Sequence, residues 1–288
     1  MRLDGRVAIV TGAGRGIGRA HAMLLAERGA AVVVNDSGVN LLGTEPSPEV
    51  ANAVAAEIIS AGGRAAASTA SVADDPESVV ATAVDAFGGV DVVVNNAGVN
   101  IRGPFGETTL DDFRHHISVH LYGAVGVTLA AWPHLVASGV GRVVNTTSST
   151  IFGIANRTAY SAAKGAIFGF TRSLAVDGEP YGVKANCVAP AAGTRMSLAS
   201  DMSEAILARM RDEMPPELVA PLVAYLAHED CAVTGETLSV VAGKVTRIAL
   251  GETAGFTDAH LTPEVVRDRI DEALDPSSLQ VIDRVIVD

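Results

Sequence analysis

Cysteine, aromatic residues and positive charge are all scarce in this 288-residue sequence. The two cysteines, Cys187 and Cys231, provide no disulfide framework, so a reducing compartment is expected. Lysine and arginine total 21 against 33 aspartate and glutamate residues, and the formal net charge of -12 argues against nucleic acid or an anionic membrane as a partner. No apolar run approaches transmembrane length, and the N-terminus, with Arg2, Asp4 and Arg6, does not resemble a signal peptide. We therefore expect a cytoplasmic protein.

Hydrophobic residues are abundant, at 48% of the chain, so a substantial core can form. Apolar segments of strand length alternate with segments of helical periodicity, which is typical of a parallel sheet covered by helices on both faces. We interpret residues 1–243 as one domain. Residues 244–288 are interpreted as an extension, with a helix starting at Thr262, that packs on the same domain or on a partner subunit. The predicted strands are 6–10, 30–35, 63–70, 90–95, 141–147, 183–188 and 238–241, and the predicted helices are 17–29, 51–61, 76–87, 110–133, 159–173 and 215–227.

A glycine-rich turn with the sequence TGAGRGIG occupies residues 11–18, between a predicted strand and a predicted helix. Gly12 lets the chain reverse, Gly16 removes a Cβ that would keep a pyrophosphate from the backbone, and Gly18 lets helix and strand pack closely. The N–H groups and positive dipole end of that helix would face the phosphates. The alternative is an ordinary glycine-rich turn, but the strand-turn-helix context predicts a dinucleotide site. Its predicted cofactor-binding residues are Gly12, Gly14, Arg15, Gly16, Ile17 and Gly18.

Asp36 follows the second predicted strand, where an acidic side chain accepts hydrogen bonds from the adenosine ribose. Its charge would repel a 2′-phosphate, whereas Arg15 in the glycine turn could help to hold one. Because Asp36 would sit at the 2′ position itself, NAD is favoured over NADP. The alternative is that Asp36 only opens the next loop as a turn residue.

A second polar segment, Asn95–Gly98, follows the fourth predicted strand. Ligands bind at the carboxyl ends of the strands in open α/β sheets, so Asn96, Ala97 and Gly98 are further candidates for cofactor binding. The amides can fix backbone groups beside the adenosine, and the two small residues permit close approach. Without that placement, the segment would indicate only a turn.

Tyr160 and Lys164 lie four residues apart, on one face of a predicted helix. A nearby ammonium favours the phenolate, so we expect the pKa of Tyr160 to be lowered towards the range of a general base. Ser148 follows the fifth predicted strand and can hold a substrate oxygen opposite Tyr160. Alternatively these are an exposed pair and a strand-end serine, but their order behind the two cofactor motifs favours a reactive site.

Together these motifs resemble the short-chain dehydrogenase/reductase family over residues 3–243. The resemblance implies an α/β fold, a single Rossmann-type domain with a doubly wound, parallel, seven-stranded sheet, and NAD-dependent oxidation of a secondary alcohol. It implies that Tyr160 transfers the proton, that Lys164 lowers the pKa of Tyr160 and binds the nicotinamide ribose, and that Ser148 orients the substrate oxygen. Hydride transfer is the chemistry of the cofactor. Further cofactor contacts are implied for Ser71, Val72, Pro190, Gly193 and Thr194, and no metal is expected.

The chain departs from the family pattern at the active site. His120 stands where the family has an asparagine, and it either holds a relay water or is a buried packing histidine. The spacing from Ser148 to Tyr160 is 12, one residue short, so Thr147 or Ser149 are alternatives for the substrate-orienting residue. The turn at 190–194 carries two alanines between Pro190 and Gly193, and its backbone must differ from the family's.

Several segments are similar to one branch of the family, the (3R)-hydroxyacyl-CoA dehydrogenase domains of peroxisomal multifunctional enzymes. That similarity implies a 3-hydroxyacyl-CoA as substrate, with a hydroxysteroid as the alternative. A non-catalytic NAD-binding protein and a reductase working in the opposite direction are further alternatives. These segments are 34–36, 119–121, 189–196, 219–223 and 261–264.

Two surfaces are assigned provisional roles. Residues 197–214 are rich in methionine and form either a flexible apolar lid or an ordinary helix over the core. Small residues on the helices around His120 and Tyr160 allow close helix approach, so a homodimer or homotetramer is expected. Those small residues are Gly123, Gly126 and Ala130 on one helix and Ala162, Ala163 and Ala166 on the other.

Overall fold

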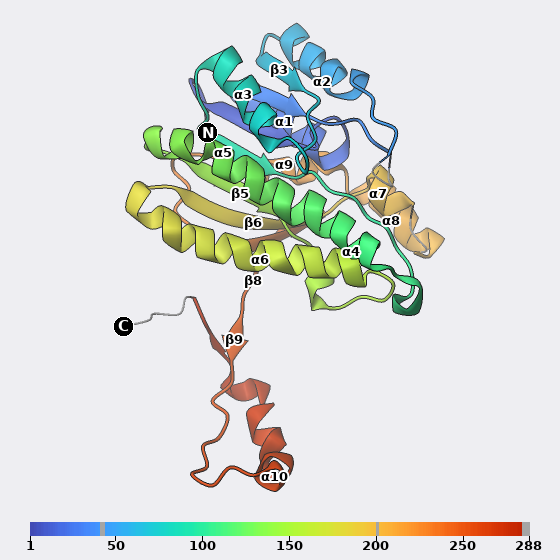
Figure 1. Ribbon diagram of the computed structural model, residues 1–288, viewed down its shortest axis with the longest axis vertical. Coiled ribbons are helices and arrows are strands. Elements are labelled where there is room, and N and C mark those ends of the chain that lie inside the picture. The colour runs from blue at the N-terminus through green and yellow to red at the C-terminus, as the bar shows by residue number, and fades with distance from the viewer. Residues whose placement is uncertain (41–43, 200–201, 284–288) are drawn as a thin grey trace. The chain divides into compact units, whose positions relative to one another are not determined.

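The computed structural model describes residues 1–40, 44–199 and 202–283, and divides the chain into two compact units, 1–246 and 247–288. The central sheet has the strand order β3-β2-β1-β4-β5-β6-β7-β8 (Figure 1). Neighbouring strands from β3 to β7 are parallel, as predicted. The strands are β1 (Val7–Thr11), β2 (Ala31–Asn35), β3 (Arg64–Ser68), β4 (Val92–Asn95), β5 (Arg142–Thr146), β6 (Lys184–Ala191), β7 (Thr237–Val241) and β8 (Lys244–Ile248).

The eighth strand was not predicted. Ala242 and Gly243 both have positive φ, 47° and 76°, between β7 and β8. Two consecutive residues with positive φ form the tight turn whose twist suits a hairpin. β8 therefore extends the predicted seven-stranded sheet by one strand.

The helices cover both faces of the sheet. The α-helices of the first unit are α1 (Gly16–Glu27), α2 (Glu49–Ser60), α3 (Pro76–Phe87), α4 (Leu110–Ile117), α5 (Gly123–Ala137), α6 (Thr158–Gly178), α7 (Arg195–Leu198), α8 (Glu204–Glu213) and α9 (Ala220–Leu226). Shorter helical turns are η1 (Phe105–Glu107), η2 (Ser118–Tyr122), η3 (Ser149–Phe152), η4 (Glu179–Tyr181) and η5 (Pro216–Leu218).

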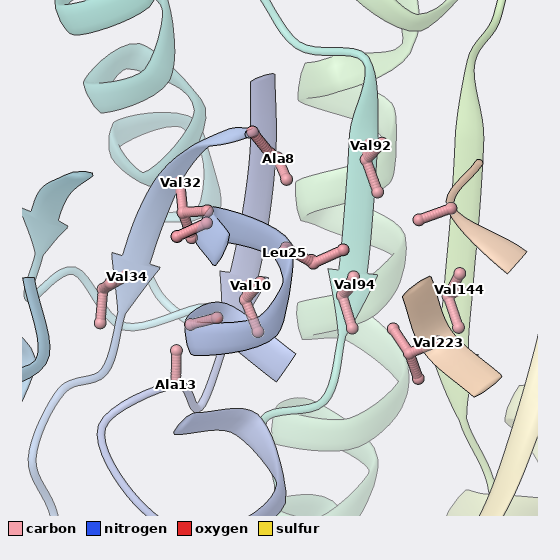
Figure 2. Close-up of a cluster of buried hydrophobic side chains, with 14 of the residues drawn as sticks. Ala8, Val10, Ala13, Leu25, Val32, Val34, Val92, Val94, Val144 and Val223 are labelled. Atoms are coloured by element: carbon pink, nitrogen blue, oxygen red, sulfur yellow. The ribbon is translucent and has the colours of Figure 1, made fainter. Parts of the chain in front are cut away.

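The uninterrupted apolar run of β1 supplies both halves of the core. Ala8 and Val10 point to one face, where α1, α2 and α9 add side chains such as Leu25 and Val223 (Figure 2). Ile9 points to the other face and packs with side chains of α3 and α5. Successive side chains of a strand alternate between faces, so a strand buried on both sides must be apolar throughout.

The helix predicted at 110–133 is a continuous helical run from Leu110 to Ala137 through α4, η2 and α5. η2 is a single π-helical turn, and Pro133 lies inside α5 rather than ending it. By length and composition alone this run is apolar enough to cross a membrane, so the expectation that no apolar segment approaches that length was wrong. Val127, Ala131 and Leu135 of α5 are fully buried in the sheet's core, and the core helix of a soluble α/β domain has the same character.

The glycines on α5 have a different role from the predicted one. A Cβ on Gly123 would lie 2.7 Å from Val72 Cγ2, and one on Gly126 would lie 2.7 Å from Pro76 Cγ. Both residues therefore allow α5 to pack closely on its own chain at α3, and neither is available to a partner.

The second unit contains β9 (Gly251–Glu252), α10 (Pro263–Ala273), η6 (Pro276–Ser278) and β10 (Gln280–Val281), with β9 and β10 antiparallel. α10 begins where predicted. The Thr262 side chain accepts a hydrogen bond from Val265 N at 3.3 Å, and proline occupies the first helical position.

Candidate active site

The site lies between β1 and β4, at the point where the strand order of the sheet reverses. β2 and β3 lie on one side of β1, and β4, β5 and β6 lie on the other. The carboxyl ends of β1 and β4 therefore border the crevice in which open α/β sheets bind ligands. The glycine turn follows β1, residues 96–98 follow β4, and Ser148 lies just beyond β5.

The glycine turn has the close contacts that its sequence predicted. A Cβ on Gly18 would lie 2.1 Å from the Gly12 carbonyl oxygen, and one on Gly12, where φ is +63°, would lie 2.8 Å from Ala97 Cα. Asn96 Nδ2 donates to the carbonyl oxygens of Thr11 at 2.9 Å and Gly12 at 3.2 Å. The two predicted cofactor motifs are thus joined directly.

The N-terminus of α1 suits an anionic ligand. Within the described residues, no side chain caps the helix at Arg15, and its first turn carries no acidic residue. Free N–H groups at a helix start bind phosphate, so the residues present fit a dinucleotide. Ile17 instead packs against the core.

Asp36 is pinned beside the glycine turn. Its Oδ2 accepts a hydrogen bond from Gly14 N at 2.8 Å, and its Oδ1 accepts one from Gly38 N at 2.7 Å. The Arg15 guanidinium donates to the Val39 carbonyl oxygen at 3.3 Å, in the loop that follows Asp36. Asp36 is therefore better placed than Arg15 for the predicted ribose contact.

The remaining predicted cofactor residues have mixed placements. The methyl carbon of Thr194 would lie 3.3 Å from a Cβ on Gly16, so the loop after β6 closes over the glycine turn. Gly193 N donates to the Met214 carbonyl oxygen at 2.7 Å. The hydroxyl of Ser71 is bonded to Asp74 Oδ2 at 2.6 Å. Val72 is buried against α5, and Pro190 lies within β6.

Tyr160, Lys164 and Ser148 are brought together. Lys164 Nζ lies 5.7 Å from the centroid of the Tyr160 ring, and the Ser148 hydroxyl is close enough to the Tyr160 phenol to lower its pKa. Thr147 is not a rival for Ser148, because its hydroxyl donates to the Lys164 carbonyl oxygen at 2.7 Å in the core. Ser149 is exposed at the start of η3.

Burial changes both pKa values. It lowers the pKa of Lys164 to about 7 and raises the pKa of Tyr160, against the opposing effects of Ser148, Arg157 and Arg102. The expected lowering of the Tyr160 pKa by Lys164 is therefore not found. Lys164 Nζ donates to the Thr146 carbonyl oxygen at 2.6 Å, and desolvation of the phenolate outweighs nearby positive charge.

His120 lies in the π-helical turn η2 and is 3% exposed. Its Nε2 lies 2.8 Å from the Val99 carbonyl oxygen, and its Nδ1 has no hydrogen-bond partner among the described residues. Burial, and then the charge of Lys164, hold the pKa of His120 well below its usual value, so the ring is neutral. Gly98 makes room for this ring, because a Cβ there would lie 2.4 Å from His120 Cε1. The absence of a side chain at Gly98 therefore leaves room for the His120 ring as well as for a cofactor.

A cavity of about 10 Å³ adjoins His120, Lys164 and Asn95. Asn95 Oδ1 is also buried without a partner in the described part of the chain. This volume is about that needed for one water molecule, and polar groups of Thr11 and Thr146 line it as well.

His116 is a neighbour of the site that was not predicted. It stacks on His120 with ring centroids 5.9 Å apart, and both rings meet the Tyr160 ring edge-on, at 6.2 and 5.3 Å. His116 Nδ1 donates to the Asp112 carbonyl oxygen at 2.7 Å, and Nε2 accepts from Ile101 N at 3.2 Å. The spacing of four residues between His116 and His120 was the available signal.

The chain matches known proteins along most of its length. Residues 6–205 match the short chain dehydrogenase family. The chain is 41% identical to mouse peroxisomal multifunctional enzyme type 2, over 96% of this chain and 38% of that protein. A short chain dehydrogenase structure from Mycobacterium avium has a TM-score of 0.80 at 40% identity and covers 95% of this chain and 97% of its own. A 7α-hydroxysteroid dehydrogenase, complexed with NADH and 7-oxo glycochenodeoxycholic acid, has a TM-score of 0.75 at 29% identity, over 84% of this chain and 94% of its own.

A Rossmann-type sheet with a dinucleotide turn and a Ser-Tyr-Lys cluster defines an oxidoreductase acting on CH–OH donors. The chain belongs to the short-chain dehydrogenase family, whose members bind NAD or NADP. It spans well under half the length of the mouse multifunctional enzyme.

Proposed function

We propose that this protein oxidises the secondary alcohol of a 3-hydroxyacyl-CoA to the ketone, with NAD as the hydride acceptor. The position of Asp36 is the main support for NAD over NADP, because hydrogen bonds hold both of its carboxylate oxygens beside the glycine turn. A 2′-phosphate there would meet a fixed negative charge. The NADH bound by the hydroxysteroid dehydrogenase structure agrees with this choice.

Each residue of the cluster has a role in this proposal. The substrate hydroxyl accepts a hydrogen bond from Ser148 and gives its proton to the Tyr160 oxygen, which becomes a proton acceptor only after it has passed on its own phenol proton. The nicotinamide supplies the chemistry of hydride transfer when it is bound. Because its pKa is about 7, Lys164 can lose or gain a proton near neutral pH.

We further propose that His120 belongs to a proton relay. A water in the small cavity accepts a hydrogen bond from Lys164 Nζ and donates to His120 Nδ1 and Asn95 Oδ1, which otherwise have no partner among the described residues. His120 Nε2 then keeps its proton and donates it in a hydrogen bond to the Val99 carbonyl oxygen at 2.8 Å, which fixes the neutral tautomer. Three buried polar groups support this arrangement over simple packing of the ring.

The acyl-CoA substrate is supported by the 41% identity to a multifunctional enzyme, and a hydroxysteroid is the second candidate because of the bile-acid ketone in one similar structure. The test is NADH formation with a panel of (3R)-hydroxyacyl-CoAs and hydroxysteroids, with NAD and NADP compared. Tyr160→Phe is expected to abolish turnover and to leave NAD binding intact. Cofactor binding without turnover of any substrate would instead favour a non-catalytic protein.

We also propose that the protein is a homodimer or homotetramer. Leu129 on α5 is 68% exposed and Val176 on α6 is 48% exposed, and a Cβ on Gly165 or Gly169 of α6 would meet nothing within 4 Å. Exposed apolar side chains beside small residues suit close packing by a second helix.

Part of the proposed lid lies outside the described residues, and the remainder includes the buried side chains of Met210 and Met214.

A further inference from the structure

A second pocket, of about 220 Å³, adjoins the start of α6 next to Tyr160. Its walls come from the loop after β4, the start of α4 and the segment 156–159 that leads into α6. Arg102 and Arg157 both line this pocket. Neither arginine belongs to a recognisable sequence motif, because each stands alone in its own loop.

Arg157 carries the positive charge that is most available to a ligand. In the described part of the chain its guanidinium makes no ion pair or hydrogen bond, and its side chain is only partly exposed. It is the N-cap residue of α6, where no side chain of the described residues caps the helix and the first turn holds no acid. A partly buried guanidinium beside the free N–H groups of a helix start favours the binding of an anion.

Arg102, on another loop that lines the same pocket, is held in place by two backbone carbonyl groups. Its guanidinium donates to the carbonyl oxygens of Met196 at 2.6 Å and Ala199 at 3.0 Å. The positive charges of Arg157 and Arg102 both lower the pKa of Tyr160, so both reach the reacting phenol.

Two acidic residues also line the pocket and limit its charge. Asp112 Oδ2 accepts two hydrogen bonds from Thr109, from N and Oγ1, both at 2.8 Å, and is thereby occupied in capping α4. Glu107 is exposed. The pocket therefore carries two guanidinium groups together with one hydrogen-bonded and one exposed carboxylate.

We propose that this pocket binds an anionic oxygen group of the substrate, a carboxylate or a phosphate, with Arg157 as its main ligand. The proposal rests on the proposed function, because the substrate must place its hydroxyl at Tyr160. A guanidinium binds such a group through two parallel N–H···O bonds, which fixes orientation as well as affinity. Anionic alcohols are then preferred over neutral ones of the same shape.

The experiment compares two matched pairs of substrates. The first pair is 3-hydroxybutyrate and its methyl ester, and the second is 3-hydroxybutyryl-CoA and the corresponding N-acetylcysteamine thioester. We expect Arg157→Gln to lower the preference for the anionic member, measured as the ratio of kcat/KM values, by about 10- to 100-fold, as for loss of a hydrogen bond to a charged group. Arg157→Lys is expected to restore part of it.

Each outcome has a definite meaning. A fall in the first pair identifies a carboxylate as the bound group, and a fall in the second identifies the phosphates of CoA. Arg28→Gln, an exposed residue at the end of α1, makes the same change in net charge and should leave both ratios unchanged. Equal loss for both members of each pair would assign Arg157 to Tyr160 instead and overturn the proposal. A shift in the pH profile of the methyl ester is expected in any case, because the charge of Arg157 lowers the pKa of Tyr160.

The proposed function can fail separately. If the wild type oxidises none of the four alcohols, calorimetric titration with inorganic phosphate and with 3-hydroxybutyrate still tests the pocket. Binding to wild type and Arg28→Gln but not to Arg157→Gln supports the proposal. Equal binding to all three, or binding to none, contradicts it.

Discussion

Burial sets the chemistry of individual residues in this site. Lys164 is 3% exposed, and its ammonium donates a hydrogen bond to the Thr146 carbonyl oxygen at 2.6 Å. The charged form is therefore disfavoured, and the pKa of Lys164 falls to about 7. A lysine that titrates near neutrality can pass protons, whereas an exposed lysine remains charged.

The depressed pKa of Lys164 predicts a stability that depends on pH. Between pH 7 and about 10.5 the unfolded chain keeps the proton that the folded chain has lost, so stability rises with pH in this window. We expect the urea midpoint of the wild type to rise relative to that of Lys164→Met from pH 7 to pH 10, without cofactor. A constant difference between the two midpoints would show that Lys164 is charged in the folded protein.

Replacement of His120 tests the relay. His120→Leu keeps the bulk of the side chain but removes the acceptor Nδ1, so we expect kcat to fall by about 10- to 100-fold. NAD affinity should change little, because Asp36 and the glycine turn are untouched. His120→Asn supplies a polar group again and should recover part of kcat. Equal kcat values for the leucine variant and the wild type would make His120 a packing residue.

The glycine turn is the element whose geometry the sequence described best. A Cβ at Gly18 would lie 2.1 Å from the backbone of Gly12, so α1 must move away from β1 to accommodate one. We expect Gly18→Ala to weaken NAD binding at least tenfold and to lower Tm. The control is Gly89→Ala, whose Cβ would have its nearest neighbour at 3.9 Å, in His134. Such a substitution is expected to be neutral or to stabilise by about 0.4–1 kcal/mol.

Strands and glycines were predictable because their signals are local. β1 was expected at 6–10 and occupies Val7–Thr11. An uninterrupted apolar run of this length is typical of a strand that is buried on both faces of a parallel sheet. The π-helical turn at His120 and the continuation of α5 through Pro133 were not predictable. Both depend on which side chains and carbonyls meet in the folded molecule.

The site residues also divide into those that the sequence predicted and those that it did not. The order of Ser148, Tyr160 and Lys164 along the chain predicted their meeting, and the structure brings them together. The direction of the Tyr160 pKa shift was wrong, because desolvation depends on all the atoms packed around the phenol. Arg102 and Arg157 were missed because separate loops bring them to one pocket.

At the scale of the molecule, the candidate site lies at the carboxyl ends of the sheet strands, and α5 and α6 expose Leu129, Val176 and the small residues Gly165 and Gly169. If these exposed residues join subunits, Gly169→Arg should split the oligomer, since the new side chain meets nothing within 4 Å in its own chain. Light scattering after size exclusion would then show a monomer with an unchanged circular dichroism spectrum. A monomeric wild type at micromolar concentration would contradict the proposed assembly.

Gly98 and His120 behave as one steric unit. Any side chain at position 98 would occupy the space of the imidazole, 2.4 Å from Cε1. In evolutionary terms the two positions are epistatic: a larger residue at 98 becomes acceptable only after position 120 has changed. The order in which these two substitutions can accumulate is therefore constrained: a change at 98 can follow one at 120 but cannot precede it.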